Sequence, residues 1–281
     1  FYRVVEQIKQ RLGSNPLVIS LPVFKEECFS GIIDLLKMKY YTFAGKLGND
    51  IAEKPIPLEY TDTAKQWRSV LVERLAETDD ALLDLYYNNE EIDADLLSRV
   101  IRTNTIAGNM VPVCCGSSYR NIGVQLLLDS IVDYLPSPLD VPGSKAVVME
   151  TTETINIMPD SQDAFSALVF KIINDRHVGR LAFARVYSGK LKAGALVFNS
   201  SKNKRERVGR LLRIHAEHRE EINEVAAGDI VAIIGLKDIG TGDTLCSESF
   251  PILLETIDFP QPVIQIAIEP KNQAGPDKIS E

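Results

Sequence analysis

The sequence predicts a multidomain protein with an α/β first part and an all-β second part. Three observations carry this prediction. The stretch 111–138, VPVCCGSSYRNIGVQLLLDSIVDYLPSP, is typical of a buried strand, a tight polar turn and an amphipathic helix. The proline- and glycine-containing segment 136–150 indicates a domain boundary. Residues 164–257 then alternate short strand-like runs with glycine-containing turns, as in a small closed antiparallel barrel.

The composition restricts the class of protein. The chain has 281 residues, of which 45% are hydrophobic and 25% charged, and its formal net charge is −8. This is the composition of a soluble protein with room for two or more cores. Because the chain is acidic overall, any nucleic-acid contact must come from a local basic patch. No apolar run approaches the roughly 18 residues needed to cross a bilayer, so no membrane partner is expected. The missing initiator Met indicates a fragment or a processed product.

The first half predicts a helix, a group of strands and a long helical segment. Residues 1–12 place Val5, Ile8 and Leu12 on one helical side, with Gly13 as a C-terminal cap. The runs LVISLPV and FSGIIDLLKMKYYTF, within 17–43, favour strands. A polar loop, AGKLGNDIAEKP, and a strand at IPLEY are expected to follow.

From about Thr63 to Ile106 the pattern is helical, and Asp93 is placed as the N-cap of a later helix. The apolar residues of the first helix here recur at helical spacing: Trp67, Val70, Leu71 and Leu75. Acidic residues dominate this segment: Glu77, Asp79, Asp80, Asp84, Glu90, Glu91, Asp93 and Asp95. A solvated face is the interpretation that we favour, and a docking surface for a basic partner is the alternative.

The helix after the polar turn at 116–123 has all its apolar positions on one face: Val124, Leu127, Leu128, Ile131, Val132 and Leu135. Pro136 and Pro138 end this helix. Beyond the barrel, residues 259–269, FPQPVIQIAIE, alternate as a further strand.

The four cysteines are Cys28, Cys114, Cys115 and Cys246, without a C-x-x-C pair. The adjacent Cys114 and Cys115 are expected on opposite faces of a strand. They permit a vicinal redox pair, but we favour buried thiols in a reducing cytosol, which implies a cytoplasmic protein.

The segments CCGSSYRNIGVQ and DYLPSP closely resemble the end of the GTPase domain of elongation factor G. The resemblance continues in collinear order through FYRVVEQIKQRLG, GRLAFARVYSGKLKAG, REEINEVAAGDIVAIIGLKDIGTGDTLC and FPQPVIQIAIEPK. The departures are Ser118 where the family usually has Ala, a second cysteine at Cys114, and a short loop at 44–55.

This resemblance implies the domain organisation. Residues 1–13 and 109–140 would be a helix and the C-terminal strand and helix of a P-loop GTPase domain. Residues 14–108 would be its α+β insertion subdomain, 141–258 a translation-factor β-barrel, and 259–281 the first strand of a truncated third domain.

The resemblance also implies a nucleotide site. Ser117, Ser118 and Tyr119 occupy the family's fifth GTPase motif, whose backbone N–H groups contact the guanine O6. The alternative is a helix start at which Ser117, Ser118 or Asn121 caps the next helix.

No G-x-x-x-x-G-K-[ST] occurs in the chain, so nothing in it would cradle the β- and γ-phosphates or hold Mg²⁺. Residues 203–206, Asn-Lys-Arg-Glu, imitate the guanine motif N-K-x-D but are expected to be a turn. We therefore expect this chain alone neither to bind nor to hydrolyse nucleotide, whereas the parent protein would use GTP and Mg²⁺. No catalytic residue is predicted.

A local basic set is the candidate RNA contact: Lys202, Lys204, Arg205, Arg207, Arg210 and Arg213. A solvated turn that blunts a strand edge is the alternative, and the family's contact with small-subunit ribosomal RNA favours the RNA. His215 and His218 have a spacing that can ligate a metal, but their strand-end context indicates a surface pair, and His177 is expected in a loop.

By resemblance, the parent protein promotes GTP-dependent ribosomal translocation of tRNA and mRNA, or ribosome recycling. Its insertion subdomain would contact a large-subunit stalk protein and its barrel the small subunit, and we expect a monomer. The alternatives are a non-enzymatic ribosome- or RNA-binding module and a sibling translational GTPase of the release-factor class. The sizeable insertion at 14–108 disfavours a ribosomal protection protein.

Overall fold

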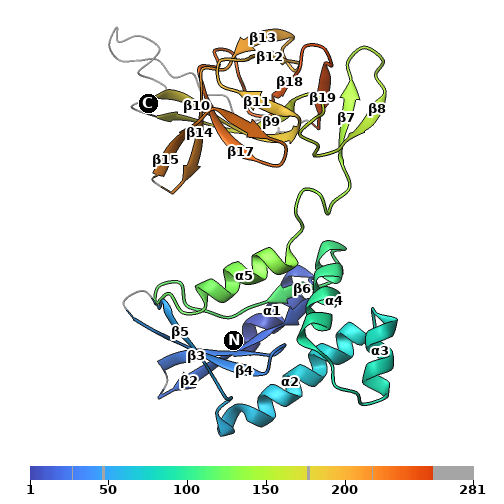
Figure 1. Ribbon diagram of the computed structural model, residues 1–281, viewed down its shortest axis with the longest axis vertical. Helices are drawn as coiled ribbons and strands as arrows, with labels where there is room; N and C mark the ends of the chain where they lie inside the picture. Colours follow the sequence, from blue (N-terminus) through green and yellow to red (C-terminus); the bar gives the residue numbers. More distant parts are fainter. Residues whose placement is uncertain (27, 46–47, 176–177, 217, 256–281) are drawn as a thin grey trace. The chain divides into compact units, whose positions relative to one another are not determined.

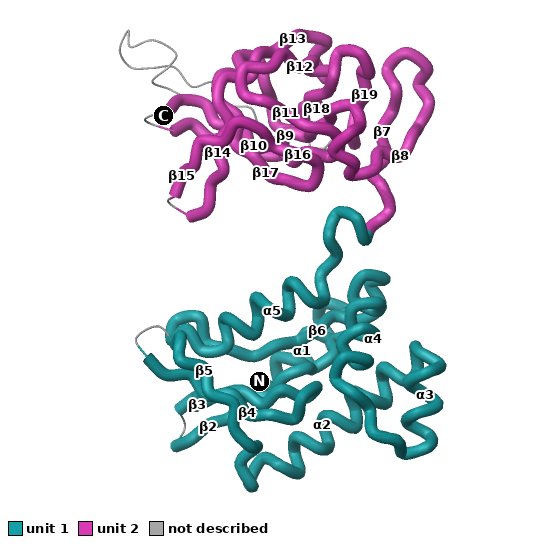
Figure 2. The backbone as a smooth tube through the Cα atoms, viewed as in Figure 1, with its two compact units in different colours: residues 1–140 teal, residues 141–281 magenta. Residues whose placement is uncertain are grey.

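The computed structural model describes residues 1–26, 28–45, 48–175, 178–216 and 218–255 (Figure 1). The chain forms two compact units, residues 1–140 and 141–281 (Figure 2). The strand predicted at 259–269 lies outside the described residues. Among the described residues, no helix is both long and apolar enough to span a membrane.

Helix α1 (Tyr2–Leu12) starts the first unit and ends at Gly13, whose φ of 62° lies in the left-handed region that favours glycine. The predicted cap is thus confirmed. The predicted apolar side is only partly used, because Val5 packs against the core while Leu12 is 72% exposed.

Strands β1 (Pro16–Val18) and β6 (Val111–Val113) form a two-stranded parallel sheet. Between them the chain builds a four-stranded antiparallel sheet in the order β2-β3-β4-β5. Its strands are β2 (Ser20–Lys25), β3 (Cys28–Asp34), β4 (Lys39–Ala44) and β5 (Asp50–Lys54).

Two expectations for residues 44–60 are wrong. Strand β5 lies within the segment predicted as a polar loop, and IPLEY contains the start of a helix instead of a strand. The loop interpretation failed because all five residues of β5 are exposed, so no buried face imposes an apolar alternation. The strand interpretation failed because Pro57 is the N-cap of the helix.

Three helices follow the four-stranded sheet, and they are α2 (Leu58–Ala76), α3 (Asp80–Tyr87) and α4 (Ala94–Ile106). The predicted helical segment is confirmed, although it begins five residues earlier than Thr63. Asp93 is the N-cap of α4 without a side-chain hydrogen bond, whereas Asp79 caps α3 by accepting from the N–H of Leu82 at 2.9 Å. The core of this unit includes Leu17, Leu21, Ile33, Leu71, Leu75, Leu97 and Ile101.

Helix α5 (Val124–Tyr134) follows the polar turn. Its N-cap is Gly123, at φ 78°, so the expectation of a cap from Ser117, Ser118 or Asn121 is wrong. A Cβ at Gly123 would come within 3.0 Å of the Ile32 side chain, which leaves no room for a capping serine.

The apolar face predicted for α5 exists but is not buried. Its exposed members are Leu127, Leu128, Ile131, Val132 and Leu135, whereas the buried residue of the helix is Tyr134. Arg102 of α4 holds the C-terminal end of α5 by donating to the Asp133 carbonyl at 2.8 Å and pairing with Asp140 at 2.7 Å.

The described part of the second unit consists of strands. They are β7 (Ser144–Val148), β8 (Thr154–Ile157), β9 (Ser166–Asp175), β10 (Gly179–Ser188), β11 (Lys190–Lys192), β12 (Leu196–Asn199), β13 (Lys204–Arg207), β14 (Arg210–His215), β15 (His218–Ile222), β16 (Glu224–Ala226), β17 (Ile230–Ile234), β18 (Thr244–Cys246) and β19 (Ile252–Leu254). Eight of them form an antiparallel sheet in the order β13-β12-β18-β9-β10-β17-β14-β15, beside smaller sheets β11-β16 and β19-β7-β8.

The predicted barrel is not closed by strand pairing. Among the described residues, the end strands β13 and β15 do not pair with each other, although the chain passes from β13 to β14 through only Val208 and Gly209. Single hydrogen bonds instead join β13 and the second residue after it to the end of β17 and the segment that follows. Gly209 donates its N–H to the Ile234 carbonyl at 2.8 Å, and the buried Glu206 carboxylate accepts from the N–H groups of residues 237 and 238.

We predict that Leu75→Ala lowers the free energy of unfolding of the first unit by about 2–5 kcal/mol, since Leu75 is fully buried. The control Val70→Ala, on an exposed position of α2, changes it by about 0.5 kcal/mol or less. Urea unfolding followed by Trp67 fluorescence measures both, because the chain has one Trp and it lies in this unit. Equal effects of the two variants would contradict the assigned core.

Candidate functional site

The turn between β6 and α5 presents backbone N–H groups that make no hydrogen bond with a described residue, and they belong to Gly116, Ser118, Tyr119, Arg120 and Gly123. Ser117 and Ile122 exchange N–H···O=C hydrogen bonds of 2.9 Å, and the N–H of Asn121 donates to the Ser118 carbonyl at 3.1 Å. The N–H groups of Ser118 and Tyr119 have no acceptor among the described residues. The Tyr119 side chain is 99% exposed, so this end of the turn is open to a ligand with acceptor atoms.

The sequence predicts that Ser117, Ser118 and Tyr119 contact a ligand here, and the structure gives these residues different roles. Ser117 already donates its N–H within the turn, so of these three residues only Ser118 and Tyr119 can offer main-chain donors. A Cβ at Gly116 would lie 2.9 Å from the Ile122 carbonyl oxygen, which explains the glycine that precedes Ser117. The turn is therefore tight, and its open donors do not depend on side-chain identity at position 118.

Strand β2 anchors the start of this turn. The Ser20 hydroxyl accepts from the N–H of Cys115 at 3.0 Å, and its oxygen lies 3.5 Å from the Cys115 sulfur. Cys114 faces elsewhere, with its sulfur 3.8 Å from the Ser130 hydroxyl. All four cysteines are free, and burial raises the pKa of the Cys115 thiol to about 11 and also raises that of Cys114.

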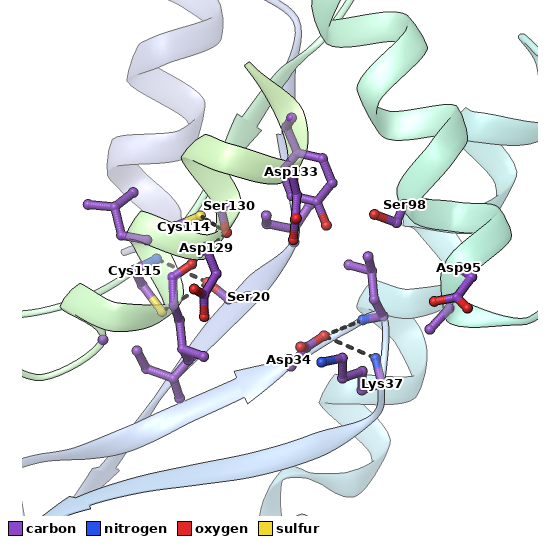
Figure 3. Close-up of a pocket in the computed structure, with 18 residues that line it drawn as sticks. Ser20, Asp34, Lys37, Asp95, Ser98, Cys114, Cys115, Asp129, Ser130 and Asp133 are labelled. Carbon is purple, nitrogen blue, oxygen red and sulfur yellow. Dashed lines mark hydrogen bonds between the residues drawn. The ribbon is translucent and has the colours of Figure 1, made fainter. Parts of the chain in front are cut away.

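A cavity of about 300 Å³ lies beside the turn, lined by β2, β3, α4 and α5 (Figure 3). Carboxylates from different elements face it: Asp34, Asp95, Asp129 and Asp133. Asp34 has a local role, because it accepts from the N–H groups of Leu36 at 2.7 Å and Lys37 at 3.0 Å. Among the described residues, no group of three or more His, Cys, Asp or Glu could hold a metal ion.

The basic residues predicted to contact RNA lie on β13, β14 and the turn before β13, and most are ion-paired. Lys202 and Lys204 both pair with Asp238, and their charges and hydrogen bonds lower the pKa of that carboxyl to about 2. Arg205 pairs with Glu248. On β14, the Arg210 and Arg213 guanidinium groups lie 3.5 and 3.9 Å from Glu221 and Glu220 respectively.

Arg207 differs from these residues, since it is exposed and forms no ion pair with a described residue. The sequence could not show that the other basic residues are ion-paired, because their acidic partners lie between 7 and 43 positions away along the chain. Such exposed pairs are weak in water and exchange readily for other anions.

Residues 203–206 form a turn and the start of β13, with Asn203 at φ 55°. The buried carboxylate of Glu206 joins β13 to the segment after β17, which we call the barrel seam, and the sequence did not reveal this role. His215 and His218 face each other across the β14–β15 hairpin with ring centroids 5.0 Å apart. His177 lies outside the described residues.

Comparisons with known proteins show what the chain is similar to. The family model for elongation factor G domain 2 matches residues 164–248. The chain is 92% identical, over all 281 residues, to "Elongation factor G 1" of Syntrophomonas wolfei and 47% identical to "Elongation factor G 2" of the same organism. It spans 42% and 40% of the lengths of these two relatives. A crystal structure of a Thermus thermophilus protein superposes with a TM-score of 0.74 at 25% identity, covering 99% of this chain and 39% of that one.

We predict that iodoacetamide at pH 8 modifies the exposed Cys28 much faster than Cys115. With a pKa of about 11, only about one Cys115 thiol in a thousand is the reactive thiolate at this pH. Mass spectrometry of the labelled peptides measures both rates, and the urea-unfolded chain is the control in which the two rates converge. Comparable labelling in the folded chain would contradict the burial of Cys115.

Proposed function

The chain is similar to elongation factor G over its full length, as its sequence predicts, and we propose that it carries the guanine side of such a factor's GTPase domain together with its barrel domain. The parent factor would promote GTP-dependent movement of tRNA and mRNA on the ribosome, or ribosome recycling. The observation that carries the proposal is the pair of open N–H donors at Ser118 and Tyr119, in the segment that resembles the family's guanine-contacting motif.

Ser118 and Tyr119 would donate to the guanine O6 through the main chain. This contact needs no particular side chain, which is why Ser118 can replace the family's usual Ala. Ser117 supports the turn and does not itself contact the base. Of the parts of GTP, this chain would contact the guanine base. Because the 281 residues contain no G-x-x-x-x-G-K-[ST], the groups that hold the phosphates and Mg²⁺ would come from other segments of the factor.

The domain assignment follows the same proposal. Residues 1–13 and 109–140 would belong to a P-loop GTPase domain, and 14–108 would be its insertion subdomain, whose secondary structure runs from β1 to α4. Residues 141–258 would form the barrel, and 259–281 would begin a third domain.

The partners would be ribosomal. The acidic helices of the insertion suit a basic stalk protein of the large subunit, and the β13–β14 surface suits small-subunit ribosomal RNA. The factor would act as a cytoplasmic monomer. A non-enzymatic ribosome- or RNA-binding module is the second candidate, and the basic set on β13 and β14 is the observation in its favour.

We predict that this chain alone shows no heat of binding with GDP in isothermal titration. A full-length factor, in which the chain occupies the segment matched in the Syntrophomonas wolfei protein, would bind GDP. The difference is expected because the phosphates supply most charge-based contacts to a nucleotide. Tight binding by the short chain would contradict the proposed division of the site, and absence of binding by the full-length factor would favour the non-enzymatic module.

We also predict that Arg207→Ala weakens binding of the chain to small-subunit ribosomal RNA and reduces the slope of log K against log salt by about 1. Lys145→Ala on β7 is the matched control, since Lys145 lies 57 positions before Lys202 and, like Arg207, is an exposed cation without an ion pair to a described residue. Filter binding at a series of salt concentrations measures both. The RNA assignment fails if the two variants lose affinity equally.

A further inference from the structure

We infer that Gln125 and Gly48 are positioning residues for the guanine-contacting turn, so that the insertion subdomain sets how strongly the site selects guanine. This inference rests on the proposed function. It adds a role for the β4–β5 hairpin, which lies more than 60 positions before the turn in the sequence and to which no part of that function has been assigned.

The hairpin contacts the turn backbone to backbone at Gly48. This residue has a φ of 61°, and a Cβ added to it would come within 3.0 Å of the Asn121 carbonyl oxygen. Both the left-handed conformation and the close approach require glycine at this position. The Gly48 backbone therefore limits where Asn121 can lie.

Gln125, in the first turn of α5, ties the same two segments together. Its side-chain Nε2 donates to the Gly48 carbonyl at 3.2 Å. Its Oε1 is buried and has no hydrogen-bond partner among the described residues. A buried acceptor without a partner is destabilising, so local stability alone does not account for glutamine here. The hydrogen bond to the Gly48 carbonyl accounts for the glutamine.

A planar peptide carries this constraint to the nucleotide donors. The Asn121 N–H donates to the Ser118 carbonyl at 3.1 Å. The Ser118 carbonyl and the Tyr119 N–H belong to one planar peptide unit and point in opposite directions. Fixing Asn121 through Gly48 therefore fixes the direction of the Tyr119 N–H, one of the two donors proposed to contact the guanine O6.

A second contact supports the end of the turn. A Cβ at Gly123 would come within 3.0 Å of the Ile32 side chain on β3, so the insertion's sheet packs directly against the residue that starts α5. The turn is thus supported at both Asn121 and Gly123 by residues of the insertion. Loss of either support would let the donors rotate away from an acceptor without unfolding the GTPase core.

The test compares two ligands that differ at the acceptor these donors would read. GDP has the guanine O6, whereas 6-thioguanosine diphosphate has sulfur, a weaker hydrogen-bond acceptor, at this position and keeps the N1–H and 2-amino donors. Isothermal titration of the full-length factor gives a dissociation constant for each, and their ratio reports the O6 contact. We expect Gln125→Leu to lower this selectivity ratio by roughly 3- to 10-fold by weakening GDP binding alone.

Two further variants complete the design. Gly48→Ala, which pushes the hairpin away from Asn121, is expected to lower the ratio in the same way and serves if Gln125→Leu does not fold. Gln66→Leu, the same chemical change at an exposed position of α2, is the control and leaves the ratio unchanged. Circular dichroism during thermal unfolding confirms that each variant is folded.

The outcomes separate the inference from the proposed function. A wild-type factor that binds both ligands equally would show that the turn does not read O6, which overturns the proposed function. A selective wild-type factor whose Gln125 and Gly48 variants keep the same ratio would overturn only the positioning role. Equal weakening of both ligands would also overturn it, because that result indicates a merely structural effect.

Discussion

The parallel pairing of β1 with β6 is the constraint on which the first unit depends. Each strand has three residues, and the register joins Pro16 to Val111 and Val18 to Val113 across more than 90 positions of sequence. Flanking bonds extend it, from the Val111 N–H to the Asn15 carbonyl and from the Ile19 N–H to the Val113 carbonyl. Because β6 leads directly into the turn at 116–123, this pairing sets where the turn begins, and the whole insertion must fold as a loop that returns to its start.

The segment between β1 and β6 also contacts the turn and helix α5. Its strands contact the turn at two points, the hairpin at Gly48 and the sheet at Ile32, while its helix α4 holds the far end of α5 through Arg102. Both ends of the segment proposed to carry the guanine contact are therefore braced by one subdomain.

Local patterns predicted the elements with strong periodicity and missed those defined by distant neighbours. The glycine cap at Gly13, the helices within 58–106 and the strand-turn-helix order at 111–138 follow from capping and apolar spacing. The expectation that the strand of this last segment is buried and includes Cys114 and Cys115 is wrong, because β6 ends at Val113 and Val111 is 47% exposed. Strand β5 has no buried face, so nothing in its sequence marks it. The ion-pair partners of Lys202 and Arg205, and the role of Glu206 at the barrel seam, depend on tertiary contacts that spacing cannot show.

The central claim is that the Ser118 and Tyr119 main-chain donors face the guanine base when the phosphates are held by the rest of the factor. A structure of the full-length factor with bound GDP tests it most directly. The claim predicts guanine O6 within about 2.7–3.2 Å of at least one of these two nitrogens, with the Gln125–Gly48 hydrogen bond intact. A GDP molecule whose base lies away from the turn, with both N–H groups facing solvent, would contradict it.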